Sequence, residues 1–185
     1  VAAAITGGEL LLAPVIYDHL EMVAAKLREA GAAVEVAGDQ MLVRGPRFLK
    51  SLDIRTGPHP SFPTDMQPQF TAMLCLAHGT SIVMENVYSS RFKHVEEFLR
   101  MGAEITVDGR LAVVRGPCRL TGARLKATDL RAGAAMVLAG LAAEGVTEVE
   151  HIHHVDRGYE GLERKLRSVG ASICRKSSVS AEIFV

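Results

Sequence analysis

The residues best suited to chemistry are one aspartate and three arginines near the predicted starts of helices. Asp65 stands in the first turn of a predicted helix, where Thr64 and Gln67 form a capping-box pattern. An acid at this position usually stabilises the helix, because it faces the positive end of the helix dipole. The preceding loop, 57–63, contains three prolines, and a stiff loop that ends on a carboxylate could hold it in fixed geometry for proton transfer. Both interpretations of Asp65 stay open at this point.

The three arginines are Arg91, Arg131 and Arg157, and each is predicted to lie in the first turn of a helix, with Arg131 at the third helical position. A cation in a first turn is disfavoured by about 0.3–1 kcal/mol. Three such residues at related positions indicate a common cause, and Leu20 stands at the corresponding position of an earlier segment. A guanidinium beside a helix N-terminus is a strong site for phosphate or carboxylate. Asp129 could orient Arg131 or serve as an ordinary helix-start acid, and the sequence does not separate these roles.

Signals for a metal site or a reactive thiol are weak. The segment 151–154 carries three histidines and could present two imidazoles on one strand face, but the related segment 85–88 carries none. Cys75, Cys118 and Cys174 lie far apart and form no CxxC pair. We therefore predict no metal and no cofactor, structural roles for the cysteines, and a reduced compartment.

The chain is organised by internal repeats, which set the elements that must position these residues. One phrase recurs three times, as LREAGAAVEV (27–36), LRMGAEITV (99–107) and LRSVGASIC (166–174). Other segments keep similar offsets: PTDMQ (63–67) returns as ATDLR (127–131), and GGELLL (7–12) matches GTSIVM (79–84). The repeats predict three units, approximately 1–50, 51–120 and 121–185. The first unit is incomplete at its N-terminus, so that VAAAI is expected to be the tail of a helix.

Each full unit is predicted to have the order βαβαββ. The second unit is predicted to contain strand 53–55, helix 65–78, strand 81–87, a helix over 91–101, and two strands over 104–107 and 110–114. The helix at 91–101 would bury Phe92, Val95 and Leu99 on one face. Asp108 and Gly109 are predicted to form the two-residue turn between the last two strands.

One helix in each full unit is unusually apolar. The segments 70–77 and 132–143 have almost no polar face, and a helix that is apolar all round is buried all round. Burying these helices places the sheets outside, which reverses the usual barrel. The predicted fold is a single α/β domain over 1–185, an inside-out α/β barrel with buried helices and outer sheets.

Composition excludes several classes of function. Among 185 residues, 21 are Lys or Arg and 21 are Asp or Glu, so no basic surplus is available for a phosphate backbone. Trp is absent and aromatic residues make up 5%, which argues against base stacking. The longest apolar stretch is too short to span a bilayer, and no secretory signal is recognisable. We expect neither nucleic acid nor membrane as a partner.

Several long phrases of this sequence resemble the enolpyruvyl transferase family, and within it the UDP-N-acetylglucosamine 1-carboxyvinyltransferases. They are TGPHPSFPTDMQPQF (56–70), ENVYSSRFKHVEEFLRMGA (85–103), ATDLRAGAAMVLAGLAAEG (127–145) and HHVDRGYEGLERKLRSVGA (153–171). The resemblance implies two similar inside-out domains with the active site between them, of which this chain is the C-terminal part. It also implies transfer of enolpyruvyl from phosphoenolpyruvate to UDP-N-acetylglucosamine, in peptidoglycan synthesis in the bacterial cytoplasm.

The resemblance implies roles for six residues. It assigns catalytic roles to Asp65, Asp129 and Arg157, and substrate contacts to Asp65, Val87, Arg91, Arg131 and Arg157. Asp65 would act as general base toward the 3-hydroxyl of the sugar. The missing N-terminal half would supply a mobile loop with a reactive residue that none of the three cysteines matches. This chain alone is therefore expected to be inactive. The alternatives are a 3-phosphoshikimate 1-carboxyvinyltransferase-type domain and a non-catalytic, anion-binding relic of the fold.

Overall fold

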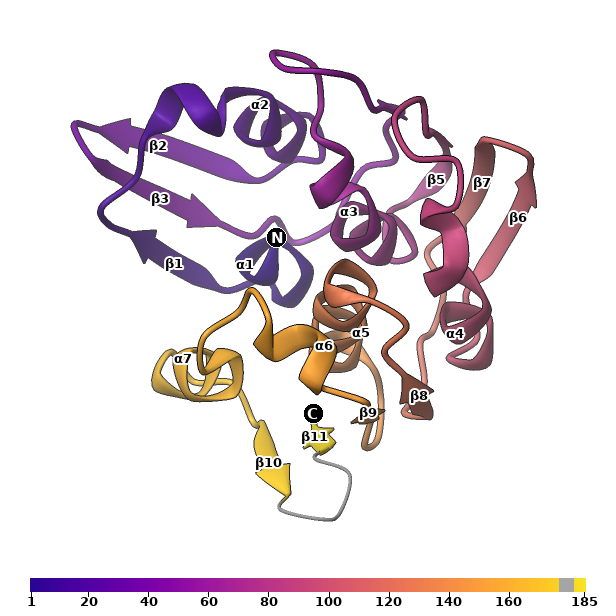
Figure 1. Ribbon diagram of the computed structural model, residues 1–185. Coiled ribbons are helices and arrows are strands. Elements are labelled where there is room, and N and C mark those ends of the chain that lie inside the picture. The colour runs from indigo at the N-terminus through magenta and orange to yellow at the C-terminus, as the bar shows by residue number, and fades with distance from the viewer. Residues whose placement is uncertain (177–181) are drawn as a thin grey trace.

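The computed structural model describes residues 1–176 and 182–185 (Figure 1). The second unit contains β4 (Ile54–Arg55), η2 (Thr64–Met66), α3 (Gln67–Leu74), β5 (Gly79–Met84), η3 (Arg91–His94), α4 (Val95–Arg100), β6 (Glu104–Asp108) and β7 (Leu111–Gly116). The third contains β8 (Arg124–Lys126), α5 (Leu130–Ala142), β9 (Glu148–Glu150), α6 (His153–Asp156), α7 (Leu162–Ser168), β10 (Cys174–Lys176) and β11 (Glu182–Phe184). The predicted order βαβαββ is confirmed in the second unit. In the third unit two short helices, α6 and α7, stand where one helix was predicted between β9 and β10.

The first unit has the same plan without its leading strand. It contains α1 (Ala2–Thr6), β1 (Glu9–Leu12), η1 (Tyr17–His19), α2 (Glu21–Glu29), β2 (Ala33–Ala37) and β3 (Gln40–Arg44). The three sheets have matching strand orders: β4-β5-β7-β6, β8-β9-β11-β10 and β1-β3-β2. In the two larger sheets the first strand is parallel to the second, and among the described residues β1 has no such neighbour.

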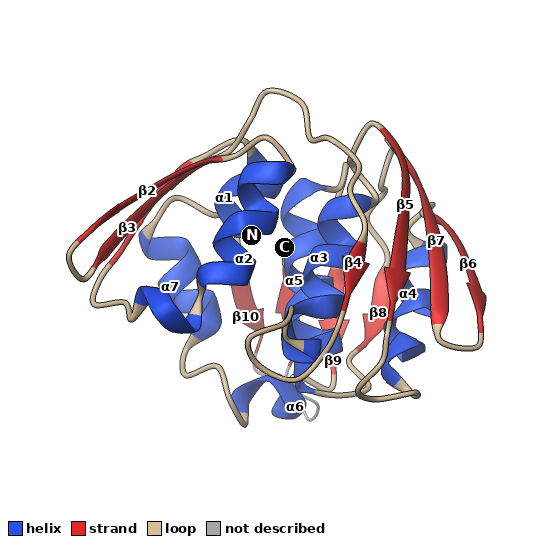
Figure 2. Cartoon of the chain, turned by 90° about the horizontal axis from the view of Figure 1, so that it is seen from above, coloured by secondary structure: helices blue, strands red, loops and turns tan. Residues whose placement is uncertain are grey.

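The three sheets surround helices α1, α3 and α5, which pack together at the centre (Figure 2). All eight residues of α3 are buried, and most of α5 is buried as well. Along β7 the inward residues Ala112 and Val114 are fully buried, whereas their neighbours are not. This alternation is typical of a sheet with one face on a core and one in solvent. The inside-out arrangement is confirmed, but among residues 1–176 and 182–185 the three sheets are hydrogen-bonded separately and do not close into one barrel.

Two glycines allow the central helices to approach the sheets closely. A Cβ atom at Gly116, where β7 ends, would lie 2.3 Å from the carbonyl oxygen of Ala77, just beyond α3. At Gly45, in the first unit, it would lie 2.2 Å from the oxygen of Ala3 in α1. Both glycines belong to the phrase Arg-Gly-Pro, at 44–46 and 115–117. The glycine of this phrase is therefore a packing requirement, since only glycine leaves room for the neighbouring carbonyl oxygen.

Several predicted boundaries are wrong in detail. The helix expected over 65–78 is a 3₁₀ turn followed by α3, and the one expected over 91–101 is likewise a 3₁₀ turn followed by α4. Phe92 and Val95 are buried as predicted, but Leu99 is exposed, and Phe98 is buried instead. Since Asp108 pairs with Leu111, the turn is formed by Gly109 and Arg110.

The predicted match of 7–12 with 79–84 is also shifted by one residue. Leu10 pairs with Val43 as Ser81 pairs with Val114, so Leu10 corresponds to Ser81. Local sequence similarity therefore gave the wrong register. The error matters, since a slip of one residue exchanges the two faces of a strand. In the part of the chain that the structure describes, no helix has both the length and the apolar character needed to cross a bilayer.

Candidate active site

The starts of the central helices of the second and third units meet through an ion pair. Nε of Arg131 donates to Oδ1 of Asp65 at 2.6 Å, and Nη2 donates to Oδ2 at 2.8 Å. The two residues are 66 positions apart in sequence and are brought together because α3 packs against α5. A planar guanidinium and a carboxylate in this two-bond geometry form the most directional of charged contacts.

Arg91 joins this pair from the 3₁₀ turn η3. Its Nη2 lies 3.5 Å from Oδ1 of Asp65, and its Nε donates to Oγ1 of Thr64 at 3.2 Å. The guanidinium also stacks over the ring of Tyr88, 4.8 Å from the centroid. Because its side chain is only 10% exposed, Arg91 is a constrained cation rather than a free surface arginine. Asp65, Arg91 and Arg131 together are called the ion-pair cluster below.

Asp129 is the N-cap of α5. Its Oδ1 accepts from the backbone N–H of Arg131 at 2.8 Å and from that of Ala132 at 3.1 Å. The helix begins at Leu130, so Arg131 is its second residue rather than the predicted third. Of the two roles left open for Asp129, the structure shows the helix-start acid, and by fixing this turn it also sets where the Arg131 side chain leaves the backbone.

Thr64 does not form the predicted capping box. The residue preceding η2 is Pro63, and no side chain caps η2 or α3 among the described residues. The Thr64 hydroxyl instead donates to Oε2 of Glu85 at 3.0 Å while accepting from Arg91. Sequence reasoning missed Glu85, although an acid directly after the apolar segment SIVM was a signal that could have found it.

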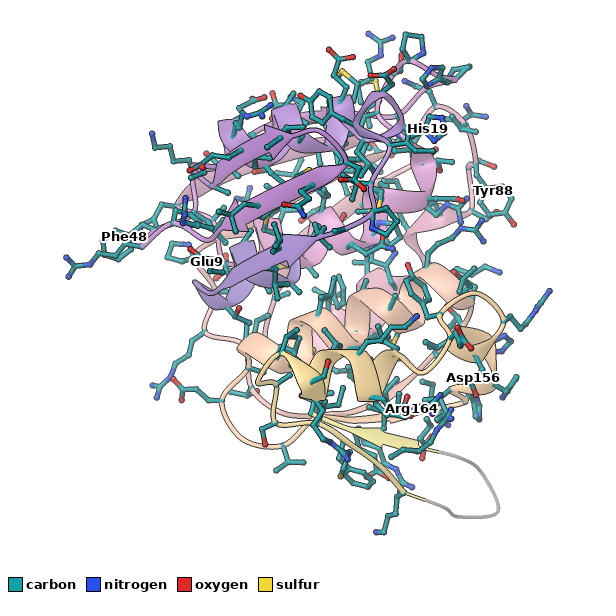
Figure 3. All side chains as sticks on the ribbon, turned by 90° about the vertical axis from the view of Figure 1, so that its left-hand side faces the viewer. Glu9, His19, Phe48, Tyr88, Asp156 and Arg164 are labelled. Carbon is teal, nitrogen blue, oxygen red and sulfur yellow. The ribbon has the colours of Figure 1, made fainter. Side chains whose placement is uncertain are left out.

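Arg157 is at the end of a helix and not in a first turn. It follows α6 as its C-cap residue, and it is exposed. Within residues 1–176 and 182–185, Arg157 forms no hydrogen bond or ion pair. Two positions later, the Tyr159 hydroxyl accepts from Nε2 of Gln69 in α3 at 3.0 Å, so this segment borders the start of α3. Figure 3 shows the labelled Asp156 and Tyr88 on the same side of the molecule.

Val87 and Asp65 line one cavity of about 320 Å³. Its other walls are the Pro-rich loop, the end of η1 and the start of α2. Besides Val87 and Asp65, the lining residues are Asp18, His19, Glu21, Met22, Gly57, Pro58, His59, Pro60, Ser61, Pro63 and Thr64. Val87 is 47% exposed, so its side chain is accessible from solvent. A larger cavity of about 990 Å³ lies between the first and third units, but no predicted site residue lines it. The candidate site is therefore located by the residues that line its cavity and not by the volume of the cavity.

The ion-pair cluster changes the acidity of its own members. Hydrogen bonds from Arg131 lower the pKa of Asp65, with a further lowering by the charge of Arg91, while burial opposes the shift. The same hydrogen bonds raise the pKa of Arg131, and the charge of Asp129 adds to that effect. Asp65 is thus a weaker base while it is paired with Arg131.

The described residues contain no group of three His, Cys, Asp or Glu side chains that could hold a metal ion. The strand β9 ends at Glu150, and His153 and His154 belong to α6, so these histidines do not lie together on one strand face. All three cysteines are free. Burial of Cys75 raises the pKa of its thiol, which is the opposite of what an activated nucleophile needs.

The repeated inside-out units and an acid held between arginines at the helix starts define the class, an enolpyruvyl-transferase-type α/β domain. The family model described as EPSP synthase (3-phosphoshikimate 1-carboxyvinyltransferase) matches residues 1–166, and the chain belongs to this family.

Curated relatives include UDP-N-acetylglucosamine 1-carboxyvinyltransferase 2 of Geobacillus kaustophilus, 52% identical over 183 residues, with 99% of this chain and 43% of the relative covered. UDP-N-acetylglucosamine 1-carboxyvinyltransferase 1 of Caldanaerobacter subterraneus is 54% identical over 176 residues, with 95% of this chain and 42% of the relative covered. This chain therefore spans less than half the length of these relatives.

Solved structures agree with this class. The enolpyruvyl transferase NikO from Streptomyces tendae matches with a TM-score of 0.76 at 31% identity, over 83% of this chain and 36% of that one. An EPSP synthase from Acinetobacter baumannii matches with a TM-score of 0.71 at 19% identity, over 99% of this chain and 43% of that one, and shows a shared fold.

Proposed function

We propose that this chain forms one domain of a UDP-N-acetylglucosamine 1-carboxyvinyltransferase. This enzyme would transfer the enolpyruvyl group of phosphoenolpyruvate to the 3-hydroxyl of UDP-N-acetylglucosamine and release phosphate. The observation that carries the proposal is the ion-pair cluster, assembled from two units in a chain 52% identical to relatives of that name. The setting would be the bacterial cytoplasm, where the product serves peptidoglycan synthesis, the cell wall, cell shape and cell division.

The chemistry assigns a role to each charged residue. Arg91, Arg131 and Arg157 bind the phosphate and carboxylate of phosphoenolpyruvate and stabilise the charge of the transition state. As these anions occupy Arg131, Asp65 is released from its two hydrogen bonds and accepts the proton of the 3-hydroxyl. The hydroxyl oxygen adds to the enol carbon that carries the phosphate, while the methylene carbon gains a proton. Loss of a proton from the resulting methyl group and of phosphate then gives the enolpyruvyl ether.

Two other residues support this arrangement. Asp129 holds the first turn of α5 beside the reacting centre, and Val87 contacts the sugar nucleotide in the 320 Å³ cavity. Only part of the site lies in this chain, because the chain covers 43% of its relatives. The partner that completes the site is the remaining, N-terminal half of the enzyme, and we expect no turnover without it.

The matching family model is named after an enzyme whose acceptor is shikimate 3-phosphate. A 3-phosphoshikimate 1-carboxyvinyltransferase-type domain is therefore the second candidate. A non-catalytic protein that binds anions through the same cluster is the third. Phosphate release by the chain joined to the N-terminal half distinguishes all three. Release with UDP-N-acetylglucosamine supports the proposal, and release with shikimate 3-phosphate alone overturns it. Binding of phosphoenolpyruvate without release for either acceptor favours the non-catalytic protein.

A further inference from the structure

Glu85 is a buried carboxylate at the centre of the site, and none of the roles above uses it. It directly follows β5 and is 0% exposed. Its Oε1 accepts from the Thr56 hydroxyl at 2.8 Å and from the backbone N–H groups of Val87 and Tyr88 at 2.9 Å each. Its Oε2 accepts from the Thr64 hydroxyl at 3.0 Å. Four donors therefore surround one carboxylate, which is what a buried negative charge requires.

The scaffold itself does not need this carboxylate. The position that corresponds to Glu85 is occupied by His151 in the third unit and by Pro14 in the first. Both of these units continue from the strand to the next helix without an acid at this position, through connections that are shorter than that of the second unit. Since burying a charge costs free energy that an apolar or neutral residue would not, a reason specific to the second unit is required.

That reason lies in the Thr64 hydroxyl, which has a single proton. A carboxylate can only accept, so the proton of Thr64 is committed to Glu85 and its lone pairs face the Nε–H of Arg91, 3.2 Å away. With a neutral amide at position 85 the hydroxyl could turn its proton toward the guanidinium, where it would repel Arg91. Glu85 therefore fixes the direction of the hydrogen bond that holds Arg91.

Glu85 also fixes the loop that carries the other contacts of Arg91. Its bonds to the Val87 and Tyr88 N–H groups place the Tyr88 ring under the guanidinium and Val87 in the wall of the cavity. Its bond to Thr64 places the turn η2, which carries Asp65. A single buried group thus connects the acid, the arginine and the cavity wall.

We propose that Glu85 is a positioning residue that orients Arg91 toward the anionic substrate, with Thr64 as the intermediary. The inference rests on the proposed function, because it takes the ligand of Arg91 to be phosphoenolpyruvate. It adds two residues, Glu85 and Thr64, to those that determine how that anion is bound.

The test uses four variants. Glu85→Gln keeps the shape and removes the charge, and Thr64→Val keeps the volume and removes the hydroxyl. Thr64→Ser restores the hydroxyl and serves as the rescue. Glu97→Gln is the matched control, since Glu97 is another buried acid, 7% exposed, which accepts from the N–H of Lys126 at 3.1 Å and makes no contact with Arg91.

The first measurement is the Nε–H resonance of Arg91 in a ¹⁵N–¹H spectrum of the chain, together with its affinity for inorganic phosphate. We expect Glu85→Gln and Thr64→Val to shift or lose this resonance and to weaken phosphate binding by about tenfold, as expected for a disrupted charged hydrogen bond. Thr64→Ser and Glu97→Gln keep both. If Glu85→Gln does not fold, Thr64→Val alone decides, because it leaves Glu85 with its three other donors.

The second measurement is steady-state kinetics of the chain joined to the N-terminal half. We expect the KM for phosphoenolpyruvate to rise about tenfold in Glu85→Gln and Thr64→Val, with a smaller change in kcat. A folded Glu85→Gln variant that keeps the Arg91 resonance, the phosphate affinity and the KM overturns the proposal. If the wild type does not turn over, the proposed function fails, while the resonance and the phosphate affinity still decide the role of Glu85.

Discussion

Two helix starts in this molecule share the dipeptide Thr-Asp and use it differently. At 128–129 the backbone of Asp129 is extended, with φ −160° and ψ 174°, and its carboxylate caps α5. At 64–65 the chain forms a 3₁₀ turn after Pro63, and the carboxylate of Asp65 caps nothing in the described structure. Asp65 is instead 58% exposed and is held by two arginines.

The difference follows from the loop before each helix. The second unit enters its helix through the Pro-rich loop 57–63, which ends in a 3₁₀ turn, whereas the third unit enters directly from β8. The added turn removes the acid from the cap position and directs it across the interface between α3 and α5. The same residue types therefore cap one helix and leave an acid paired with two arginines at the other, and this contrast can be tested.

The largest effect should come from Asp65→Asn, measured as turnover by the completed enzyme. A positioned general base contributes about 10²–10⁴-fold, and we expect a loss in that range with the melting temperature nearly unchanged. Asp39→Asn, at an exposed acid in the turn between β2 and β3, is the control and should keep full activity. Retention of more than half the activity by Asp65→Asn would remove Asp65 from the role of base.

The next largest effect is expected for Arg131→Lys. A lysine cannot reproduce the two parallel hydrogen bonds of a guanidinium, so phosphoenolpyruvate affinity should fall about tenfold or more. Isothermal titration with phosphoenolpyruvate measures it, and Arg119→Lys, at an exposed arginine paired with Glu144, is the control. An unchanged affinity would mean that Arg131 serves only as the partner of Asp65.

Removal of the side chain should lower the free energy of unfolding more at Asp129 than at Asp65. Asp129→Ala removes an N-cap and should lower the free energy of unfolding by about 1 kcal/mol, whereas Asp129→Asn keeps the cap. Asp65→Ala should change stability by less than about 0.5 kcal/mol, since its ion pair is largely exposed. Denaturant unfolding of the three variants checks this, and equal losses for the two alanine variants would contradict the contrast.

A smaller effect is predicted for inorganic phosphate binding to Asp65→Asn. The wild-type carboxylate occupies the guanidinium that a ligand needs, and an exposed ion pair contributes about 0.2–1 kcal/mol. Its loss should tighten phosphate binding by up to about fivefold, even though the same substitution is expected to lower turnover strongly. Weaker binding would show that Asp65 helps to hold the anion rather than competing with it.

The smallest effect concerns the pH dependence of Asp65. Its pKa is lowered from the ordinary 3.8, chiefly by the hydrogen bonds of Arg131. The ion pair therefore contributes stability above about pH 4, and that contribution is lost as the pH falls through the lowered pKa. Carboxyl ¹³C titration should place Asp65 below 3.8 in the wild type and higher in Arg131→Ala. Titration at the same pH in both proteins would show that the pair does not form in solution.

Much of the fold could be predicted from local patterns. The apolar segments 70–77 and 132–143 predicted buried helices, because periodicity and apolar content reflect how each segment contacts the core. Boundaries were less accurate: the 3₁₀ turns, the hairpin at Gly109–Arg110 and the exposed Leu99 all depend on how neighbouring units pack. Five of the six site residues lie on the starts of α3, η3 and α5 or in the 320 Å³ cavity, and Arg157 lies apart, after α6.

The sequence by itself determined the repeated units, the central apolar helices, the family and the charged residues near helix ends. Each of these depends on residues that are close together in the chain. Only the tertiary structure decided which acid caps a helix and which one pairs with arginines. The bonds from Asp65 to Arg131 and from Glu85 to Thr64 join residues 66 and 21 positions apart. Such pairs depend on how α3 packs against α5 and where β5 ends, and those distances are fixed by the burial of the core.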